Sequence, residues 1–358
     1  MYLLIITLIF ISNFCLAFSD ENQRPKNIII LIGDGMGVNY VSASILSTPS
    51  SPFRKFSSIG LSITRAANKL VTDSAPGATA ISTGYSVNYM SVAENQDKNP
   101  LKTILELAKE LGLSTGLVVT SSLTDATPAA FAAHVSNRKY QTEIAKQFVY
   151  GDIDVAIGGG EEYLIDSLIS LLGISGIGLL SQKGYDVYFG SDSLLSNQRS
   201  NKFYALLGKK ELPRANERNY SLADLTKKAL SVVSKNEKGF VLVVEGSQID
   251  WGGHQNDREY IFSELNDFCK AVDAALDFAS DSNTLVLVTA DHETGGMSIT
   301  GGSLDGLELE MKFTTTGHTA EMVGVFARGP GEELFRGVYE NYFIGRNLFK
   351  LLNPQYKF

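Results

Sequence analysis

The sequence has few cysteines, and their positions exclude a fold held together by disulfides. Of 358 residues only two are cysteine, Cys15 and Cys269. Cys15 lies in an N-terminal stretch that we interpret as a removable signal, so the mature chain keeps one cysteine and forms no internal disulfide. Its stability must come first of all from a hydrophobic core.

Charge is missing from the first 17 residues, which include the apolar run from Tyr2 to Ile11. That run is too short to span a bilayer, and Cys15-Leu16-Ala17 after it is a candidate for small-residue cleavage. We therefore predict a signal peptide at residues 1–17, a folded domain at 18–358, and a periplasmic or secreted protein without stable membrane association after cleavage. The usual basic residue before the apolar run is absent, so an uncleaved anchor is the alternative.

An excess of positive charge is also lacking, since 31 Lys and Arg face 39 Asp and Glu for a net charge of -8. This balance argues against nucleic acid or an anionic membrane surface as a partner. Apolar residues make up 44% and charged residues 20% of the chain, which is enough for one large core. Repeats and low-complexity tracts are absent as well.

Apolar strand-like runs alternate with amphipathic helical runs along the chain, which predicts an α/β fold. We expect a three-layer α/β/α sandwich with a large, mostly parallel central sheet. The predicted strands are 27–32, 59–64, 116–120, 155–157, 240–244, 284–289 and 322–327. The clearest predicted helices are 101–111, 221–233 and 258–278, and Ser221 with Asp224 resembles a capping arrangement at the start of the second.

Acidic residues follow four of these strands. They are Asp34, Asp125, Glu245 and Asp291. A single acid at a strand end is usually a turn residue or a helix cap. Ligands of such sheets gather beyond the carboxyl ends of the strands, and four converging carboxylates repel one another unless cations neutralise them. The pattern therefore predicts a metal site at this edge.

Histidine is scarce, and its placement supports the same interpretation. The four histidines are His134, His254, His292 and His318. Asp250 precedes His254 by one helical turn, Asp291 adjoins His292, and His318 follows a glycine in a loop. Nitrogen and oxygen ligands of this kind suit zinc, whereas the all-oxygen set Asp125, Thr127 and Glu245 suits magnesium. We interpret His134, among small apolar residues, as a hydrogen-bonded core residue near the site.

Ser74 lies between an apolar run and a small-residue segment that can begin a helix. A helix N-terminus favours an anion, so the position suits a nucleophile that attacks a phosphate-like group. The simpler interpretation is that Asp73 or Ser74 only caps the helix. Two metal ions with a serine between them are an arrangement suited to phosphoryl transfer.

These motifs together resemble those of alkaline phosphatases over essentially the whole mature chain. The matching segments are Ile32 to Gly37, Thr72 to Ala75, Asp125 to Pro128 with Arg138, Gly158 to Gly160, Glu245 to Asp250 with His254, Thr289 to Gly296, and Gly317 to Thr319. The resemblance implies hydrolysis of small phosphate monoesters through a phosphoserine on Ser74, with two zinc ions, one magnesium ion and a possible homodimer.

The resemblance also implies a role for each site residue. It assigns Asp250, His254 and His318 to the first zinc, and Asp34, Asp291 and His292 to the second, next to Ser74. It assigns Asp34, Asp125, Thr127 and Glu245 to magnesium. Arg138 is expected to grip two phosphate oxygens, for which its planar fork is suited, and Trp251 to border the substrate.

Two features depart from the family pattern. Trp251 stands where some members have Lys or His. It is combined here with Asp125, at a position where members with Trp often have His, so the identity of the third ion is left open. Only 25 residues separate His292 from His318, so the large insertion that often contributes to the dimer in other members is missing.

Other classes of protein fit the sequence less well. Phosphodiesterases and sulfatases of the same superfamily are the nearest alternative, but the former typically use Thr as nucleophile, and Ala78 replaces the Arg of a sulfatase signature. A nucleotide-binding oxidoreductase would need a different glycine spacing from that around Asp34. A non-catalytic metal- or phosphate-binding protein would not need both Ser74 and Arg138.

Overall fold

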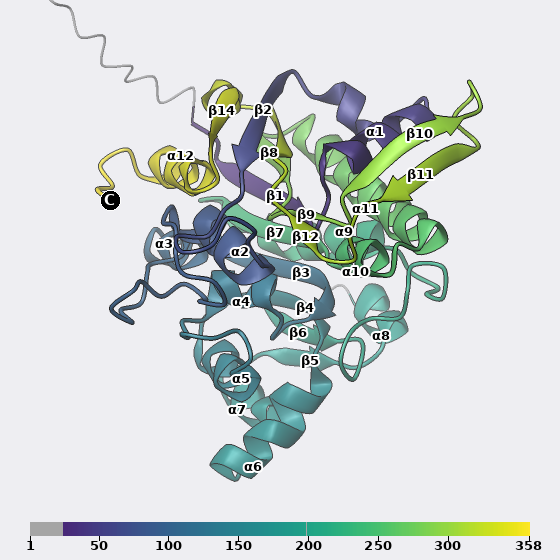
Figure 1. Ribbon diagram of the computed structural model, residues 1–358. Helices are drawn as coiled ribbons and strands as arrows, with labels where there is room; N and C mark the ends of the chain where they lie inside the picture. The colour runs from purple at the N-terminus through teal and green to yellow at the C-terminus, as the bar shows by residue number, and fades with distance from the viewer. Residues whose placement is uncertain (1–23, 198) are drawn as a thin grey trace, which may run out of the picture.

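The computed structural model describes residues 24–197 and 199–358, and its centre is a ten-stranded sheet (Figure 1). The strand order is β14 (Gly337–Glu340), β2 (Ser58–Ile63), β13 (Val323–Arg328), β8 (Thr284–Thr289), β1 (Asn27–Gly33), β7 (Phe240–Gly246), β3 (Ser114–Ser122), β4 (Val155–Gly159), β6 (Phe203–Leu206) and β5 (Asp186–Tyr188). Among these strands only β13 runs antiparallel to its neighbours. The predicted signal peptide lies outside the described residues.

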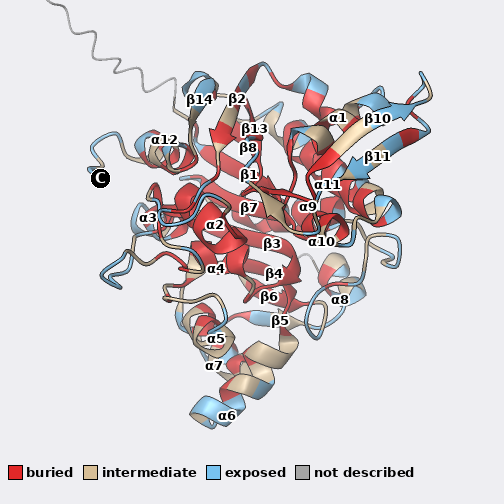
Figure 2. Cartoon of the chain, viewed as in Figure 1, coloured by how far each residue is buried: buried red, intermediate tan, exposed pale blue. Residues whose placement is uncertain are grey.

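Helices cover both faces of the sheet, as the fully buried strands require. Along β1, Ile28, Ile30 and Ile32 belong to one hydrophobic cluster, and Ile29 and Leu31 belong to the other. The first cluster is covered by α2 (Ser74–Thr83), α3 (Ile104–Glu110), α4 (Ala126–Ala132), α5 (Gln141–Tyr150), α6 (Leu168–Leu172), α7 (Gly176–Gln182) and α12 (Tyr342–Leu352). The second is covered by α1 (Val38–Ser47), α8 (Ser191–Ser196), α9 (Leu222–Val233), α10 (Gln248–Gln255) and α11 (Arg258–Ala279). Figure 2 shows the buried sheet between these layers, which confirms the predicted three-layer sandwich.

The seven predicted strands and the three predicted helices are present, with small differences at their ends. The predicted helix 101–111 begins later, as α3, because Thr103 and Glu106 form a capping box that fixes its first turn. The same arrangement of Ser221 and Asp224 caps α9, as predicted. The short strands β5, β6 and β14 were not predicted.

The order of strands explains how acidic residues that are distant in sequence meet. β8, β1, β7 and β3 are consecutive in the sheet and parallel, so their carboxyl ends lie at one edge. The acids expected at these ends, Asp34, Asp125, Glu245 and Asp291, therefore come from four adjacent strands. The predicted convergence of acids at this edge is confirmed.

The segment between His292 and His318 forms two small antiparallel sheets. β10 (Met297–Gly302) pairs with β11 (Leu309–Phe313) in a hairpin, and β9 (Glu293–Thr294) pairs with β12 (His318–Thr319). The second pair sets His318 opposite Thr294. This short return brings His318 back to the edge of the large sheet without any further domain (Figure 1).

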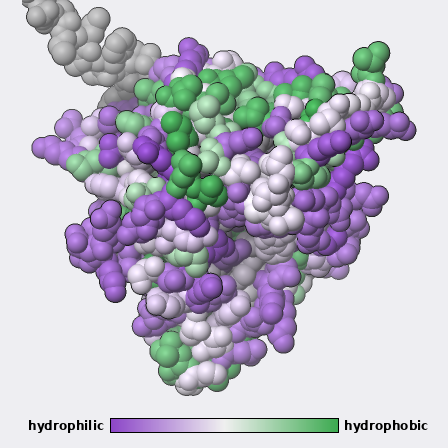
Figure 3. All heavy atoms as spheres, viewed as in Figure 1, coloured by the Kyte–Doolittle hydropathy of each residue, from purple (hydrophilic) through white to green (hydrophobic). Residues whose placement is uncertain are grey.

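Apolar side chains also reach the surface at α6. Ile169 and Leu171 are about half exposed there, and Figure 3 shows apolar residues at this lower end of the molecule. None of the single helices in the described part of the chain is long and apolar enough to cross a membrane, although the bent pair Glu162–Leu172 and Gly176–Gln182 meets the length and composition together.

Helix α2 packs directly on the loop that contains Asp291, and Gly77 permits this contact. A Cβ atom at Gly77 would lie 2.7 Å from the carbonyl oxygen of Asp291. Gly178 in α7 provides a comparison, because the nearest atom to a Cβ there is a side-chain carbon 3.3 Å away.

We expect Gly77→Ala to destabilise the protein by roughly 1–3 kcal/mol, because overpacking outweighs the helix propensity that alanine adds. Gly178→Ala is expected to be neutral or stabilising by up to about 1 kcal/mol. Urea unfolding of both variants measures the difference. Equal stability of the two variants would contradict the tight contact between α2 and Asp291.

Candidate active site

Ser74 is the first residue of α2, and its hydroxyl faces the other candidate groups. Ser74 Oγ lies 3.3 Å from His292 Nε2 and 3.3 Å from Arg138 Nη1. Asp73 occupies the N-cap position, but its side chain makes no capping hydrogen bond. Its carboxylate instead accepts hydrogen bonds from the backbone N–H of Met90 and from Arg138. A purely capping role for Asp73 is therefore wrong, and its contact with Arg138 was not predicted.

Arg138 is held by two carboxylates. Its Nη1 donates to Asp73 at 3.1 Å and its Nη2 donates to Asp125 at 2.8 Å. Burial lowers the pKa of Arg138, but the charges of Asp125 and Asp73 outweigh this and raise it, so the guanidinium stays charged. Its backbone N–H donates to the carbonyl of Met90, whose φ of 71° is in the left-handed region. Met90 thus fixes both Asp73 and Arg138 through its own strained backbone.

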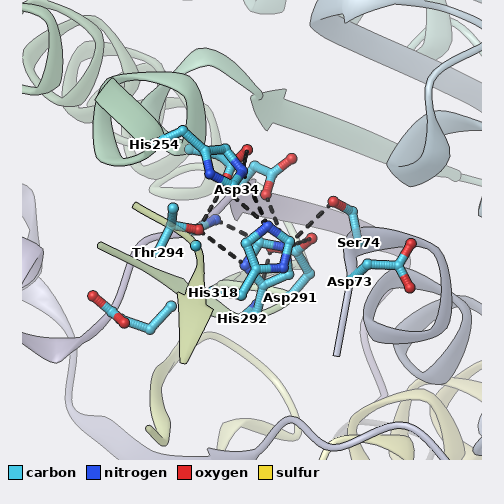
Figure 4. Close-up of polar contacts among 12 residues, drawn as sticks. Asp34, Asp73, Ser74, His254, Asp291, His292, Thr294 and His318 are labelled. Carbon is cyan, nitrogen blue, oxygen red and sulfur yellow. Dashed lines mark hydrogen bonds and ion pairs between the residues drawn. The ribbon is translucent and has the colours of Figure 1, made fainter. Parts of the chain in front are cut away.

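Three histidines converge with their Nε2 atoms toward one place, as Figure 4 shows. The Nδ1 atoms of His254 and His318 lie 2.6 Å from the carbonyl of Thr316 and 2.9 Å from that of Thr72. The Nδ1 of His292 lies 3.3 Å from the Thr294 hydroxyl. A hydrogen-bonded Nδ1 orients each ring and leaves Nε2 as the ligand atom, the usual second-shell arrangement of metal-binding histidines.

Asp250, His254 and His318 form the first group of possible ligands. His254 Nε2 lies 3.2 Å from Asp250 Oδ2 and 3.2 Å from His318 Nε2, and His318 Nε2 lies 3.6 Å from Asp250 Oδ1. Tetrahedral zinc with bonds of about 2.0 Å places its ligand atoms roughly 3.3 Å apart. The spacing of this group fits such an ion.

Asp34, Asp291 and His292 form the second group, and all three residues are buried. Their ligand atoms lie within 4.8 Å of one another, as do those of Asp250, His292 and His318. His292 Nε2 lies 3.5 Å from Asp34 Oδ1 and 3.3 Å from Asp291 Oδ2. These two carboxylate oxygens are buried without a hydrogen-bond donor. Because orphaned buried acceptors are costly, this group also fits a cation.

The predicted oxygen-ligand set combines one partly exposed residue, Asp125, with two buried ones. Asp125 N-caps α4, Thr127 lies in the first turn of α4, and Glu245 lies near the end of β7. The buried Thr127 hydroxyl lacks a hydrogen-bond partner, and Glu245 Oε2 accepts a 2.7 Å hydrogen bond from Ser247. An unsatisfied hydroxyl beside buried carboxylates suits an oxygen-liganded ion.

Thr294 connects the two histidine-containing groups, although no sequence pattern singled it out. Its hydroxyl donates to Asp250 Oδ1 and lies 3.3 Å from His292 Nδ1. Its carbonyl accepts a 2.5 Å hydrogen bond from Tyr40. Gly35, with φ of 70°, lies alongside, where a Cβ would be 2.7 Å from the Thr294 hydroxyl. Only glycine at this position leaves room for the Thr294 hydroxyl, which links the two groups of possible ligands.

The buried carboxylates of the site differ in their pKa values. Burial, followed by the charge of Asp250, raises the pKa of Asp291 to about 7. Burial and the charge of Asp125 raise that of Glu245 to about 8, although Ser247 opposes the rise. Burial would also raise the pKa of Asp250, but its hydrogen bond with His254 holds it at about 2. The same hydrogen bond raises the pKa of His254 to about 9.

Burial lowers the pKa of His292 well below its usual value, and the neighbouring His318 adds to the effect. Burial also lowers the pKa of His318. The two rings stack with their centroids 3.7 Å apart. Both imidazoles are therefore neutral near pH 7, which is the form that binds a metal ion.

A cavity of about 450 Å³ opens in front of Ser74. Its walls include Trp251, as expected, and also Tyr89, Met90, Lys139 and Gln141, which the sequence did not single out. His134 lies elsewhere, in a separate cavity, where its ring bonds with the carbonyl of Ala93 and with Glu106. His134 is hydrogen-bonded as expected, but placing it near the site was wrong.

Comparison with known proteins gives one consistent result. The model of the alkaline phosphatase family matches residues 25–312. Alkaline phosphatase 3 of Bacillus subtilis is 33% identical in an alignment that covers 94% of this chain and 91% of the relative. Alkaline phosphatase of Escherichia coli K12 is 31% identical, with 87% and 82% covered. The structure of alkaline phosphatase from the Antarctic bacterium TAB5 superposes with a TM-score of 0.85 at 38% identity, covering 92% of this chain and 98% of that one.

The raised pKa values of Asp291, Glu245 and His254 predict how a metal-free form responds to pH. Each group binds more protons in the folded than in the unfolded state, so its contribution to stability is lost as pH rises through its folded pKa. The lowered pKa of His292 acts in the opposite direction, but only below the unfolded value of about 6.5. We therefore expect the free energy of unfolding of chelator-treated protein to fall between pH 6.5 and 9.

Urea unfolding at constant ionic strength measures this trend, with Glu245→Gln as the variant whose slope is expected to be shallower. Zinc and magnesium should flatten or reverse the slope, because cations bind the deprotonated ligands. A metal-free protein whose stability rises with pH in this window would contradict the described electrostatics.

Proposed function

The chain belongs to the alkaline phosphatase family of hydrolases, and we propose from this premise that it hydrolyses phosphate monoesters through a phosphoserine on Ser74. The observation that supports the proposal most is the position of the Ser74 hydroxyl, 3.3 Å from both His292 and Arg138. A nucleophile thus stands between a cluster of possible metal ligands and a charged guanidinium. Transfer of a phosphoryl group requires both metal ions near the nucleophile and a positive charge that binds the phosphoryl oxygens.

We assign two zinc ions and one magnesium ion to this site. Asp250, His254 and His318 would hold the first zinc, and Asp34, Asp291 and His292 the second. Asp34, with Asp125, Thr127 and Glu245, would hold magnesium. A structure of a TAB5 alkaline phosphatase mutant, with Asp in place of a His, is described as having Mg bound in its M3 site, which supports magnesium as the third ion. Bound ions would supply Lewis acidity that lowers the pKa of the serine hydroxyl and neutralises charge on phosphorus.

The residues of the site then have separate roles in phosphoryl transfer. Ser74 Oγ attacks phosphorus as the bond to the leaving alkoxide breaks, and water later cleaves the phosphoserine to release phosphate. Arg138 binds two phosphoryl oxygens through its planar fork. Asp73 and Asp125 hold that fork in place before the substrate arrives, which reduces the reorganisation needed in the transition state.

Several other features of the proposal rest on the sequence. Trp251, on the wall of the cavity, would border the substrate. Residues 1–17 indicate export, so we propose action in the periplasm or outside the cell on small phosphate monoesters. A homodimer fits the family resemblance, although the segment that often contributes to it in other members is short here.

Turnover of p-nitrophenyl phosphate, compared with its bis-ester and with p-nitrophenyl sulfate, tests the reaction class. We expect the monoester to be the best substrate, and we expect chelation to abolish turnover and zinc with magnesium to restore it. Ser74→Ala should bind metal normally but should trap no labelled phosphate on the protein. Its metal content, measured on the same sample, is the control for folding.

Three results would contradict the proposal. Full activity in exhaustively demetallated protein would exclude the metal-assisted reaction. Labelled phosphate on a residue other than Ser74 would exclude the nucleophile, and a preference for the bis-ester would point to a phosphodiesterase.

The indole of Trp251 has one N–H donor and no charge, so Trp251→Lys would add a cation near bound phosphate. Added charge stabilises the product complex as well as the transition state, and tighter product binding slows a cycle that is limited by release. We expect stronger inhibition by inorganic phosphate and lower turnover at alkaline pH, with a smaller effect on kcat/KM. Inhibition constants from neutral to alkaline pH, at equal metal content, measure this effect. Unchanged inhibition would mean that Trp251 does not face the phosphate.

A further inference from the structure

The cavity in front of Ser74 encloses more than a phosphoryl group. Its volume of about 450 Å³ is in the range of small-molecule sites, so part of the leaving group also lies inside. The groups around the reacting phosphorus do not distinguish leaving groups, because they address the phosphoryl oxygens. Selectivity among monoesters must therefore arise from the outer walls.

Most charged side chains that line this cavity have an opposite partner. Asp73 and Asp125 pair with Arg138, and Asp250 pairs with His254 at 3.2 Å. Lys139 also lines the cavity, but its ammonium makes no hydrogen bond or ion pair with any residue of 24–197 or 199–358. It follows directly after Arg138 in the chain. A lysine without an ion-pair partner among the described residues thus lines the same cavity as Ser74 and Arg138.

A second donor lies next to this charge. The hydroxyl of Thr124 donates to Gln141 Oε1 at 3.1 Å, which leaves the Nε2 of that amide as a free donor on a residue that lines the cavity. Gln141 begins α5, two residues after Lys139, so both donors come from one short segment.

A second lysine lies against one residue of the cavity wall. Lys69 Nζ lies 3.6 Å from the centroid of the Tyr89 ring, and Tyr89 lines the cavity. Lys69 is not itself among the residues that line the cavity, so its ammonium is linked to the cavity through its contact with Tyr89. On a protein with a net charge of -8, lysines at and beside a binding cavity favour anionic ligands there.

We propose that Lys139, Gln141 and the Lys69–Tyr89 pair form a subsite for leaving groups that bear a second phosphate. The proposal rests on the proposed monoesterase function and adds a substrate class to it: bisphosphates and related compounds with two phosphate groups a short distance apart. One phosphate reacts at Ser74 while the other contacts Lys139 and the free amide of Gln141. Lys139 then acts as a specificity residue, separate from the group that grips the reacting phosphate.

A matched pair of substrates tests the subsite. Propane-1,3-diol monophosphate and propane-1,3-diol bisphosphate have the same scissile bond and differ only in the second phosphate. The bisphosphate has two equivalent ends, so an enzyme without the subsite shows a kcat/KM ratio of about two in its favour. We expect the wild-type ratio to exceed this by about fivefold at low salt, the effect of one ion pair near the surface, and to fall as ionic strength rises.

Three variants locate the effect. Lys139→Met should lower the ratio about fivefold, whereas Lys139→Arg should keep it, because the charge is retained. Lys227→Met, at an exposed lysine on α9 far from the cavity, should leave the ratio unchanged, and melting temperatures check that all three variants fold.

The outcomes separate this proposal from the function on which it rests. A wild-type ratio near two, or the same ratio in Lys139→Met as in the wild type, overturns the subsite while monoester turnover stands. An equal loss with both substrates in Lys139→Met also overturns it, since Lys139 would then contact the reacting phosphate. No turnover of either compound by the metal-loaded protein overturns the proposed function as well.

Discussion

Repulsion among buried carboxylates is the constraint on which this structure depends. Asp34, Glu245, Asp250 and Asp291 are each 5% exposed or less, so water does not screen them from one another. Burial, and after it the charges of the neighbouring carboxylates, raises the pKa of three of the four, Asp34, Glu245 and Asp291. A fold tolerates such a cluster only if cations bind there or protons neutralise it. The parallel strands β8, β1, β7 and β3 supply the rigid frame that keeps the acids in place.

The ligand side chains are held in place by hydrogen bonds to other residues as much as by the strands. Each of the three histidines has its Nδ1 in a hydrogen bond, and Thr294 joins Asp250 to His292. Arg138 is fixed in the same way by Asp73, Asp125 and the backbone of Met90. These contacts hold donors and acceptors in position before a substrate binds. Such preorganisation is the source of most of the electrostatic stabilisation of a transition state.

The sequence predicted the central frame and the candidate ligands because both leave local signals. Buried parallel strands are continuous apolar runs, and acids directly after them are conspicuous. The short strands β5, β6 and β14 leave no such run, since only three or four residues pair in each. The start of α3 was missed because the capping box at Thr103 outweighs the helical pattern before it. Asp73, Thr294 and His134 could not be placed, because their roles depend on partners that only the tertiary fold supplies.

The inner site and the outer walls of the cavity come from different kinds of segment. Most of the ligands and Ser74 lie at the ends of strands or in the first turns of helices, while His254 lies in the last turn of α10 and His318 begins β12. Tyr89, Met90 and Lys139, in contrast, lie on loops. Loops vary without disturbing a core, so they are where a phosphoryl-transfer site acquires selectivity. Met90 connects the two, since its N–H holds Asp73 and its carbonyl holds Arg138, next to Tyr89 in the chain. The left-handed backbone of Met90 is unusual for a residue with a side chain. A substitution in the outer wall that changes this backbone conformation would therefore also displace the guanidinium of Arg138, which binds phosphate.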